Sequence, residues 1–295
     1  MNDFKGFRNF MNYFRSFLTI YHHEEEVKQS SNKLILCMCL FPLFSFFQEL
    51  SENVEHFISL KRLMVDNNSK VESIFCLNEI NEEEMNLGFE DIDLYVLPMM
   101  QFLFVGPKNS FSLQNLTRLK IMKCEKLKTV FSTSIIRCLP QLLYMRIEDC
   151  KELNHMIEDD LENKSTNFLS TKTCFPKLKT LVVQKCNQLK YVFPMSICKE
   201  LPELDILMIR EADELEEIFV SECDDQKVEI PNMKFVVFEN LPSLCHVHGI
   251  QFQAVKHHLV QNCQKLSLSS ASAADLESDI RHLKFGYGTY SIQYF

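Results

Sequence analysis

The sequence predicts an α/β solenoid, in which short helices and loops lie on the opposite side from one parallel β-sheet. Three observations support this fold class: a ladder of apolar residues, the return of that ladder along most of the chain, and polar segments between its copies. The clearest copy is the segment 116–131, LTRLKIMKCEKLKTVF, with the skeleton LxxLxLxxCxxLxxVF. Leu119 and Ile121 alternate as in a short strand, and the later three-residue spacing is typical of a chain that turns repeatedly toward one core.

Eight copies of the ladder follow one another in one register. They begin at residues 60, 89, 116, 142, 178, 204, 233 and 255, so the intervals are 29, 27, 26, 36, 26, 29 and 22 residues. Leucine-rich repeats have a period of about 20 to 29 residues, so only the longest interval requires an insertion. A single repeat cannot bury its apolar edge, whereas stacking on a similar neighbour does so. The sequence therefore predicts a leucine-rich-repeat solenoid (horseshoe), with the parallel β-sheet on the concave face and short helices and loops on the convex face.

Two columns of the ladder carry a distinctive side chain. One column holds phenylalanine in five repeats, which we interpret as a spine packed between repeats. The other holds cysteine at positions 124, 150, 186 and 263, where such repeats place Asn or Cys as a small buried side chain that bonds backbone groups at the turn. The phenylalanines are Phe75, Phe104, Phe131, Phe193 and Phe219.

Residues 1–52 precede the array and stay unassigned. Phe4, Phe7, Met11 and Phe14 fall on one helical face, which is compatible with a cap helix, a membrane-surface helix, an organelle presequence or a non-native sequence. The segment 34–47 is apolar, but a spanning helix needs about 20 residues, so we expect no membrane span.

The repeat array runs over residues 53–268, with about eight repeats. Polar inserts at 78–86, 158–167 and 222–229 are interpreted as exposed loops on one side of the solenoid. Ser134 and Ser196 each begin a short segment that is followed by proline, which predicts helices of one or two turns on the convex side. Residues 269–295 are predicted to be a C-terminal cap helix and tail, because Leu276, Ile280 and Leu283 share one helical face.

Composition excludes several classes of function. The net charge is −9, which argues against nucleic acid as a partner. The 12 cysteines include no CxxC pair with matching histidine spacing, so a zinc site is not expected. Because four of them belong to the ladder, we expect a reducing, cytoplasmic compartment and not a disulfide framework.

Catalysis has little support in this sequence. A catalytic nucleophile needs an adjacent base, yet the His22–His23 and His257–His258 pairs stand apart from any serine or cysteine motif. The sequence contains no GxxxxGK[ST] phosphate loop, so we expect no nucleotide site. We therefore predict no catalytic, cofactor-binding or metal-binding residues, although an enzyme with a converging polar pocket on the repeats is one alternative.

Recognition is expected from the side chains that alternate with the ladder, because they point away from the core on the concave face. These side chains form a mixed surface of charged, aromatic and apolar groups. The residues predicted to bind a protein are Arg118, Lys120, Met122, Tyr144, Arg146, Glu148, Val182, Gln184, Met208, Arg210, Val237 and Glu239.

Charge changes sign from one repeat to the next. Residues 177–190 contain four Lys and no acidic residue, whereas residues 203–217 contain seven acidic residues and one Arg. A surface graded from basic to acidic would orient a partner of the opposite pattern. The alternative is that the charges have drifted under a requirement for solubility alone.

The repeats resemble those of a known family. LQNLTRLKIMKCEKLKTVF, CFPKLKTLVVQKCNQLKYVFP and LPELDILMIREADELEEIF are similar to the C-terminal repeats of plant coiled-coil nucleotide-binding leucine-rich-repeat disease-resistance proteins. The resemblance covers roughly residues 53–268. It implies an immune sensor segment that contacts a pathogen effector, a guarded host protein or the nucleotide-binding domain of a resistance protein.

Other functions stay open at this point. The chain is compatible with a generic interaction scaffold, such as the substrate arm of a ubiquitin ligase, or with a truncated fragment without independent activity. The sequence does not identify the partner or the oligomeric state. We expect no cofactor and no nucleic-acid partner.

Overall fold

The computed structural model describes residues 33–37, 61–76, 85–106, 111–136, 139–158, 175–194, 201–220, 230–247 and 255–266. The chain divides into two compact units, residues 1–33 and 34–295. Apart from Lys33, the first residue of β1, all strands described below belong to the second unit. The predicted N-terminal helix, the second predicted convex helix and the C-terminal cap helix lie outside the described residues.

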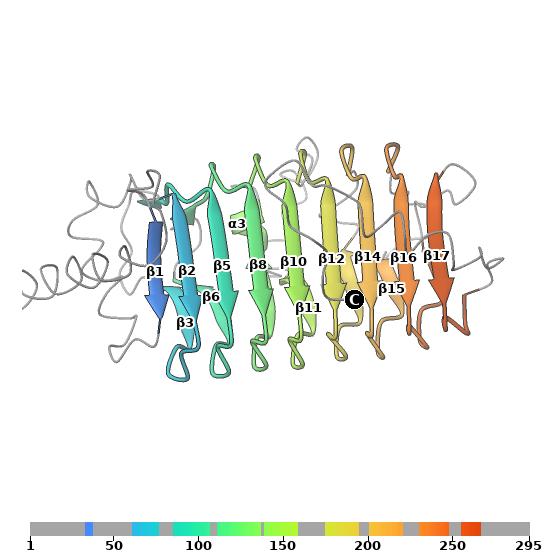
Figure 1. Ribbon diagram of the computed structural model, residues 1–295, viewed down its shortest axis with the longest axis horizontal. Coiled ribbons are helices and arrows are strands. Elements are labelled where there is room, and N and C mark those ends of the chain that lie inside the picture. The colour runs from blue at the N-terminus through green and yellow to red at the C-terminus, as the bar shows by residue number, and fades with distance from the viewer. Residues whose placement is uncertain are drawn as a thin grey trace, which may run out of the picture. The chain divides into compact units, whose positions relative to one another are not determined.

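Each predicted repeat contributes one strand to a nine-stranded sheet, and one further strand, β1, precedes them (Figure 1). From β2 to β17 every neighbouring pair is parallel and keeps the register of the ladder. The predicted leucine-rich-repeat solenoid is therefore confirmed. In sheet order the strands are β1 (Lys33–Cys37), β2 (Arg62–Asp66), β5 (Asp91–Tyr95), β8 (Arg118–Met122), β10 (Tyr144–Glu148), β12 (Thr180–Gln184), β14 (Ile206–Arg210), β16 (Phe235–Glu239) and β17 (His257–Gln261).

The ladder residues form one continuous column of buried side chains. Leu119 pairs with Met145, Met145 with Leu181, and Leu181 with Leu207. All four side chains are buried, with at most 1% of their surface exposed. Each repeat is thus the wall against which the next one packs, as the sequence predicted.

A second parallel sheet lies behind the first and was not anticipated (Figure 1). It uses the segments around the ladder's last two positions, where short runs such as TVFS and EIFV combine β-branched and aromatic residues that favour strands. A separate two-stranded sheet pairs β4 (Met85–Asn86) with β7 (Phe111–Ser112). The six strands, in chain order, are β3 (Ser73–Cys76), β6 (Phe102–Val105), β9 (Thr129–Ser132), β11 (His155–Glu158), β13 (Tyr191–Pro194) and β15 (Glu217–Val220).

Helix is scarce in the part of the chain that the structure describes. The first predicted convex helix is present as α3 (Thr133–Ile136), a single turn after β9. Ile135 and Ile136 are buried, so this turn contributes to the core. On the side where the sequence predicted helices and loops, the described backbone thus contains the short strands of the second sheet and this one helical turn.

The phenylalanine spine is present, and one ring from outside the ladder, Phe175, joins it. Phe75 stacks on Phe104 with ring centroids 5.1 Å apart. In the repeat with the long insertion the spine position holds Ile157, which pairs with Phe131 in the second sheet. Phe175, from the start of the next repeat, lies 5.9 Å from Phe131 and 5.7 Å from Phe193 between ring centroids. An aromatic ring from another position thus fills the gap left by the smaller isoleucine.

Three of the four cysteines of the column behave as the sequence predicted, whereas Cys263 is only partly buried. Cys124, Cys150 and Cys186 are buried free thiols. Each Sγ donates a hydrogen bond to the carbonyl oxygen two residues earlier, at 3.6, 3.5 and 3.4 Å respectively. Hydrogen bonds with Cys124 and Cys186, together with burial, raise the pKa of the Cys150 thiol well above its ordinary value.

Alkylation should distinguish these thiols from a more accessible one. Because only the thiolate is nucleophilic, we expect the buried column to react at least about tenfold more slowly with iodoacetamide than half-exposed Cys245 in the folded protein. In denaturant the difference should disappear. Mass spectrometry of the labelled peptides measures both rates, and fast labelling of Cys150 in the folded chain would contradict the buried column.

Candidate recognition face

The side chains that alternate with the ladder on β5 to β16 form one surface, which we call the recognition face. The strand register arranges these side chains in three rows across the nine-stranded sheet. All of the residues predicted to bind a protein lie in these rows. The first row holds Arg118 and Tyr144, the second Lys120, Arg146, Val182, Met208 and Val237, and the third Met122, Glu148, Gln184, Arg210 and Glu239.

The part of the recognition face on β5, β8 and β10 is charged. Arg118 binds two carboxylates of the neighbouring strand, with Nε 3.2 Å from Asp91 Oδ1 and Nη2 2.9 Å from Asp93 Oδ2. Asp91 also accepts a hydrogen bond from Arg62 Nε at 2.5 Å. These charges lie side by side because the outward positions of one strand are acidic and those of the next are basic. We call this part, from Asp91 to Glu148, the charged half.

Sequence analysis missed the two aspartates of this network. The strand DIDLY places Asp91 and Asp93 at the outward positions, in register with Arg118 and Lys120. The alternation of acidic and apolar residues in that strand was the available signal. Asp93 Oδ1 is buried and has no hydrogen-bond partner, so the network contains one unsatisfied acceptor.

Aromatic rings and burial shape the electrostatics of the charged half. The Lys120 ammonium lies 6.0 Å from the centre of the Tyr144 ring. Burial, and then the neighbouring Arg118, lower the pKa of Lys120. Burial, followed by the charge of Asp93, raises the pKa of Tyr95 to about 12. Burial also raises the pKa of Tyr144. The hydroxyls of Tyr95 and Tyr144 are therefore neutral donors at physiological pH.

Strand β10 completes this network. Arg146 Nη2 lies 2.6 Å from Glu148 Oε2, and both side chains are less than one fifth exposed. Such short, charge-assisted hydrogen bonds hold the two side chains in fixed positions. The charged half therefore presents its groups in a defined geometry before any partner binds.

On β12, β14 and β16 the first two rows of the recognition face are largely apolar and buried, which the sequence analysis did not foresee. Val182, Met208 and Val237 were expected to point into solvent, yet Met208 is 4% exposed and Val237 is 0% exposed. They pack with Ile206 and Leu259 in one cluster, and Phe235 packs against it. We call this group the apolar half. Its strands carry continuous apolar runs such as LVV and ILMI, which are typical of strands buried on both faces.

Polar groups border the apolar half along the third row. Gln184 Nε2 donates to Glu211 Oε1 at 3.1 Å, and Arg210 Nε lies 3.1 Å from Glu239 Oε2. Gln184, Arg210 and Glu239 are partly exposed. The third row therefore stays polar along the edge of the sheet at which the strands end.

The described residues offer no arrangement suited to metal binding. No group of three His, Cys, Asp or Glu side chains among them could hold a metal ion. Burial lowers the pKa of His155, which stacks near Tyr191 with ring centroids 5.0 Å apart. Among the helices of the described residues, none has the length and apolar character needed to cross a membrane.

Two comparisons with known proteins bear on the family of the repeats. A family model for the leucine-rich repeats of plant disease resistance proteins of the RPS2-like type matches residues 18–151 and, a second time, residues 152–284. These matches together span most of the chain. A search of curated proteins found no match.

Proposed function

Because the chain belongs to the family of RPS2-like plant disease resistance proteins with leucine-rich repeats, we propose that it is a protein-recognition module in plant defence. Its partner is a pathogen effector, a guarded host protein or the nucleotide-binding domain of a resistance protein. The module binds the partner and catalyses no reaction. Repeats of this kind present extended surfaces to other proteins, and the recognition face is such a surface.

The observation that carries this proposal is the charged half. Arg118, Asp93 and Arg146 are held by ion pairs on a rigid sheet, so their positions are fixed before binding. A rigid pattern of charges favours partners of complementary charge and rejects others, because like charges brought together cost free energy. The buried Asp93 Oδ1 would gain a hydrogen bond from a donor on the partner.

We also propose that the protein acts in the cytoplasm. Cys124, Cys150 and Cys186 lie in neighbouring repeats as free thiols, and Cys150 is within hydrogen-bonding reach of the other two. Reducing compartments preserve thiols in this state. Fractionation of plant cells that express the tagged chain tests this location, and recovery only from the secreted fraction would contradict it.

Loss of charge at two positions should weaken partner binding without unfolding the protein. We expect the double variant Lys120→Gln, Arg146→Gln to bind its partner at least about tenfold more weakly, because each substitution leaves a partner group unpaired. Both side chains are partly exposed, so the variant should stay folded, with a melting temperature lowered by the loss of the Arg146–Glu148 ion pair. Exposed Lys179, on the same molecule but outside the face, provides the matched control Lys179→Gln.

Binders are first selected with the wild-type chain from three pools: secreted pathogen proteins, host proteins and isolated nucleotide-binding domains. Each binder is then measured by surface plasmon resonance against the double variant and the control. Loss of binding with the double variant alone supports the proposal, and the pool that yields the binder identifies the partner class. If every binder keeps its affinity for the double variant, or if no pool yields a binder, the proposal is wrong.

A further inference from the structure

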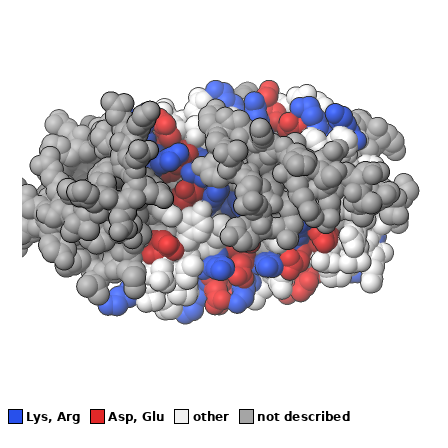
Figure 2. Space-filling view, in the orientation of Figure 1, with Lys and Arg blue, Asp and Glu red and all other residues white. Residues whose placement is uncertain are grey.

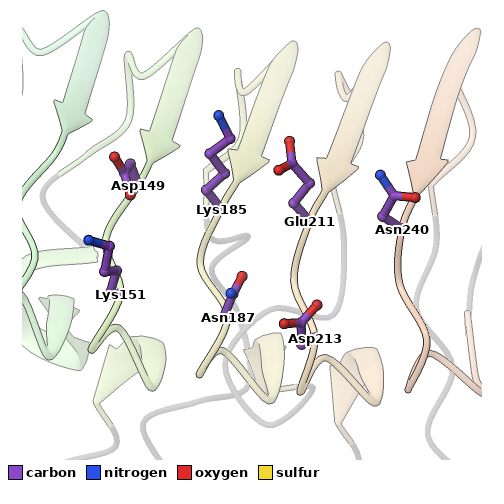
Figure 3. A pocket seen from close by; sticks show the side chains of 7 residues that line it. All are labelled: Asp149, Lys151, Lys185, Asn187, Glu211, Asp213 and Asn240. Atoms are coloured by element: carbon purple, nitrogen blue, oxygen red, sulfur yellow. The ribbon is translucent and has the colours of Figure 1, made fainter.

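A shallow cavity lies at the edge of the nine-stranded sheet at which the strands end, outside the recognition face. Its volume is about 370 Å³, and its lining comes from the residues that follow β10, β12, β14 and β16 (Figure 3). Lys185 and Asn187 follow β12, and Glu211 and Asp213 follow β14. We call this cavity the edge groove. Its size is at the lower end of the range of about 300 to 1,000 Å³ that is usual for ligand sites.

The edge groove is lined by charges of both signs, with Asp149 and Lys151 after β10, Lys185 after β12, and Glu211 and Asp213 after β14. Lys185 belongs to the repeat in which residues 177–190 contain four Lys and no acid, whereas Glu211 and Asp213 belong to residues 203–217 with seven acids. Figure 2 shows acidic and basic side chains interspersed along this edge of the molecule. The change of charge between repeats that is visible in the sequence therefore coincides with one cavity.

Most charges of the edge groove form no ion pair within the described part of the chain; the exception is Lys151, whose Nζ lies 2.6 Å from Glu125 Oε1. Within that part, the exposed side chains of Lys185 and Asp213 make no hydrogen bond and no ion pair. Glu211 accepts a hydrogen bond from the neutral amide of Gln184 and forms no ion pair with Lys185, although the two follow neighbouring strands.

Exposed charges of neighbouring repeats elsewhere in the array do pair. Lys61 Nζ lies 2.6 Å from Glu90 Oε1, and Lys234 Nζ lies 3.0 Å from Asp205 Oδ2. Lys185, Glu211 and Asp213 differ from these residues, because within the described part of the chain they form no ion pair although charges of opposite sign face one cavity. Those groups are available to a ligand.

We propose that the edge groove binds an extended peptide segment of a partner protein that presents one acidic and one basic side chain on the same side. The acidic side chain lies over Lys185, and the basic side chain lies over Asp213 and Glu211. In an extended peptide, side chains two residues apart are separated by about 7 Å, which is wider than the spacing of about 4.8 Å between neighbouring strands, so the peptide crosses the ends of β12 and β14 obliquely. This surface does not depend on the recognition face, and its partner contact is additional to the proposed function.

Four capped pentapeptides test the charge pattern: Gly-Glu-Gly-Lys-Gly, Gly-Glu-Gly-Glu-Gly, Gly-Lys-Gly-Lys-Gly and Gly-Gln-Gly-Gln-Gly. They are titrated into the full-length chain at low ionic strength, and chemical-shift changes measure the affinity. We expect the first peptide to bind at least about threefold more tightly than any other, which matches the modest strength of exposed ion pairs. Salt at about 0.5 M should remove the difference, because it screens exposed charges.

Substitutions should change which peptide is preferred, which a general loss of folding cannot do. Lys185→Glu makes the groove acidic and should shift the preference to the peptide with two lysines. Lys179→Glu makes the same change of charge at an exposed position before β12 and should keep the preference for the mixed peptide. Equal binding of all four peptides, absence of binding, or the same shift in both variants would overturn the proposal.

Discussion

Replacing Leu181 with Asp is expected to unfold several neighbouring repeats and not only the repeat that contains it. The Leu181 side chain is 0% exposed and lies in register between Met145 and Leu207. Loss of a buried leucine costs about 2 to 5 kcal/mol, and a buried carboxylate without a partner costs about 3 to 5 kcal/mol more. Since folded domains are stable by only about 5 to 15 kcal/mol, the substitution removes most or all of the free energy of unfolding.

Coupling between repeats determines how far the damage extends. In a stacked array each repeat is stabilised by its neighbours, so the loss of β12 should expose the flanking strands β10 and β14. Hydrogen exchange measured by mass spectrometry should show lost protection in all three strands, and circular dichroism should show a lower melting temperature. The milder variant Leu181→Ala should lose about 2 to 5 kcal/mol in urea denaturation.

Lys179→Asp is the matched control, because Lys179 is exposed and belongs to the same repeat. It should change the free energy of unfolding by no more than about 0.5 kcal/mol. An unchanged melting curve for Leu181→Asp, or lost protection confined to β12, would show that the column of ladder residues does not couple the repeats.

The ladder predicted the first sheet correctly because its spacing depends on the core alone. A residue such as Leu119 must be apolar in every repeat, since each copy faces the same environment between two neighbours. The phenylalanine and cysteine columns follow from the same reasoning. Stacking preserves these columns in space, so a repeat in the sequence becomes a contact in the structure.

The second sheet was harder to predict because its strands are short. Four-residue segments such as Thr129–Ser132 are too short for their period to separate strand from helix or loop. The role of Phe175 was also hidden, since it lies outside the ladder and fills the space beside Ile157. Its position depends on the long insertion before it, which breaks the constant interval between repeats.

The recognition face was predicted in position but not in character. Alternation with the ladder correctly placed all the proposed contact residues on one side of the sheet. Whether a side chain on that side is exposed depends on what else packs there, and a single strand does not contain that information. The apolar residues of β12, β14 and β16 gave a signal, because strands with one side in water seldom carry apolar residues on both faces.

Replacing Val237 with Asp should destabilise the protein strongly, although Val237 lies on the face that was expected to meet solvent. Its side chain is 0% exposed, and its neighbours Met208 and Leu259 are apolar. A carboxylate there has no partner in the apolar half, so we expect a loss of about 3 to 5 kcal/mol in the free energy of unfolding. Urea denaturation followed by circular dichroism measures this loss.

The control for this substitution is Gln261→Asp, which places the same charge on β17 at an exposed position. It should cost no more than about 0.5 kcal/mol. If Val237→Asp is as stable as this control, the apolar half is open to solvent, and Val182, Met208 and Val237 are accessible to a partner. If Val237→Asp is destabilised as expected, the side chains of the apolar half are already buried in the folded protein. Binding through the recognition face must then rely on the charged half.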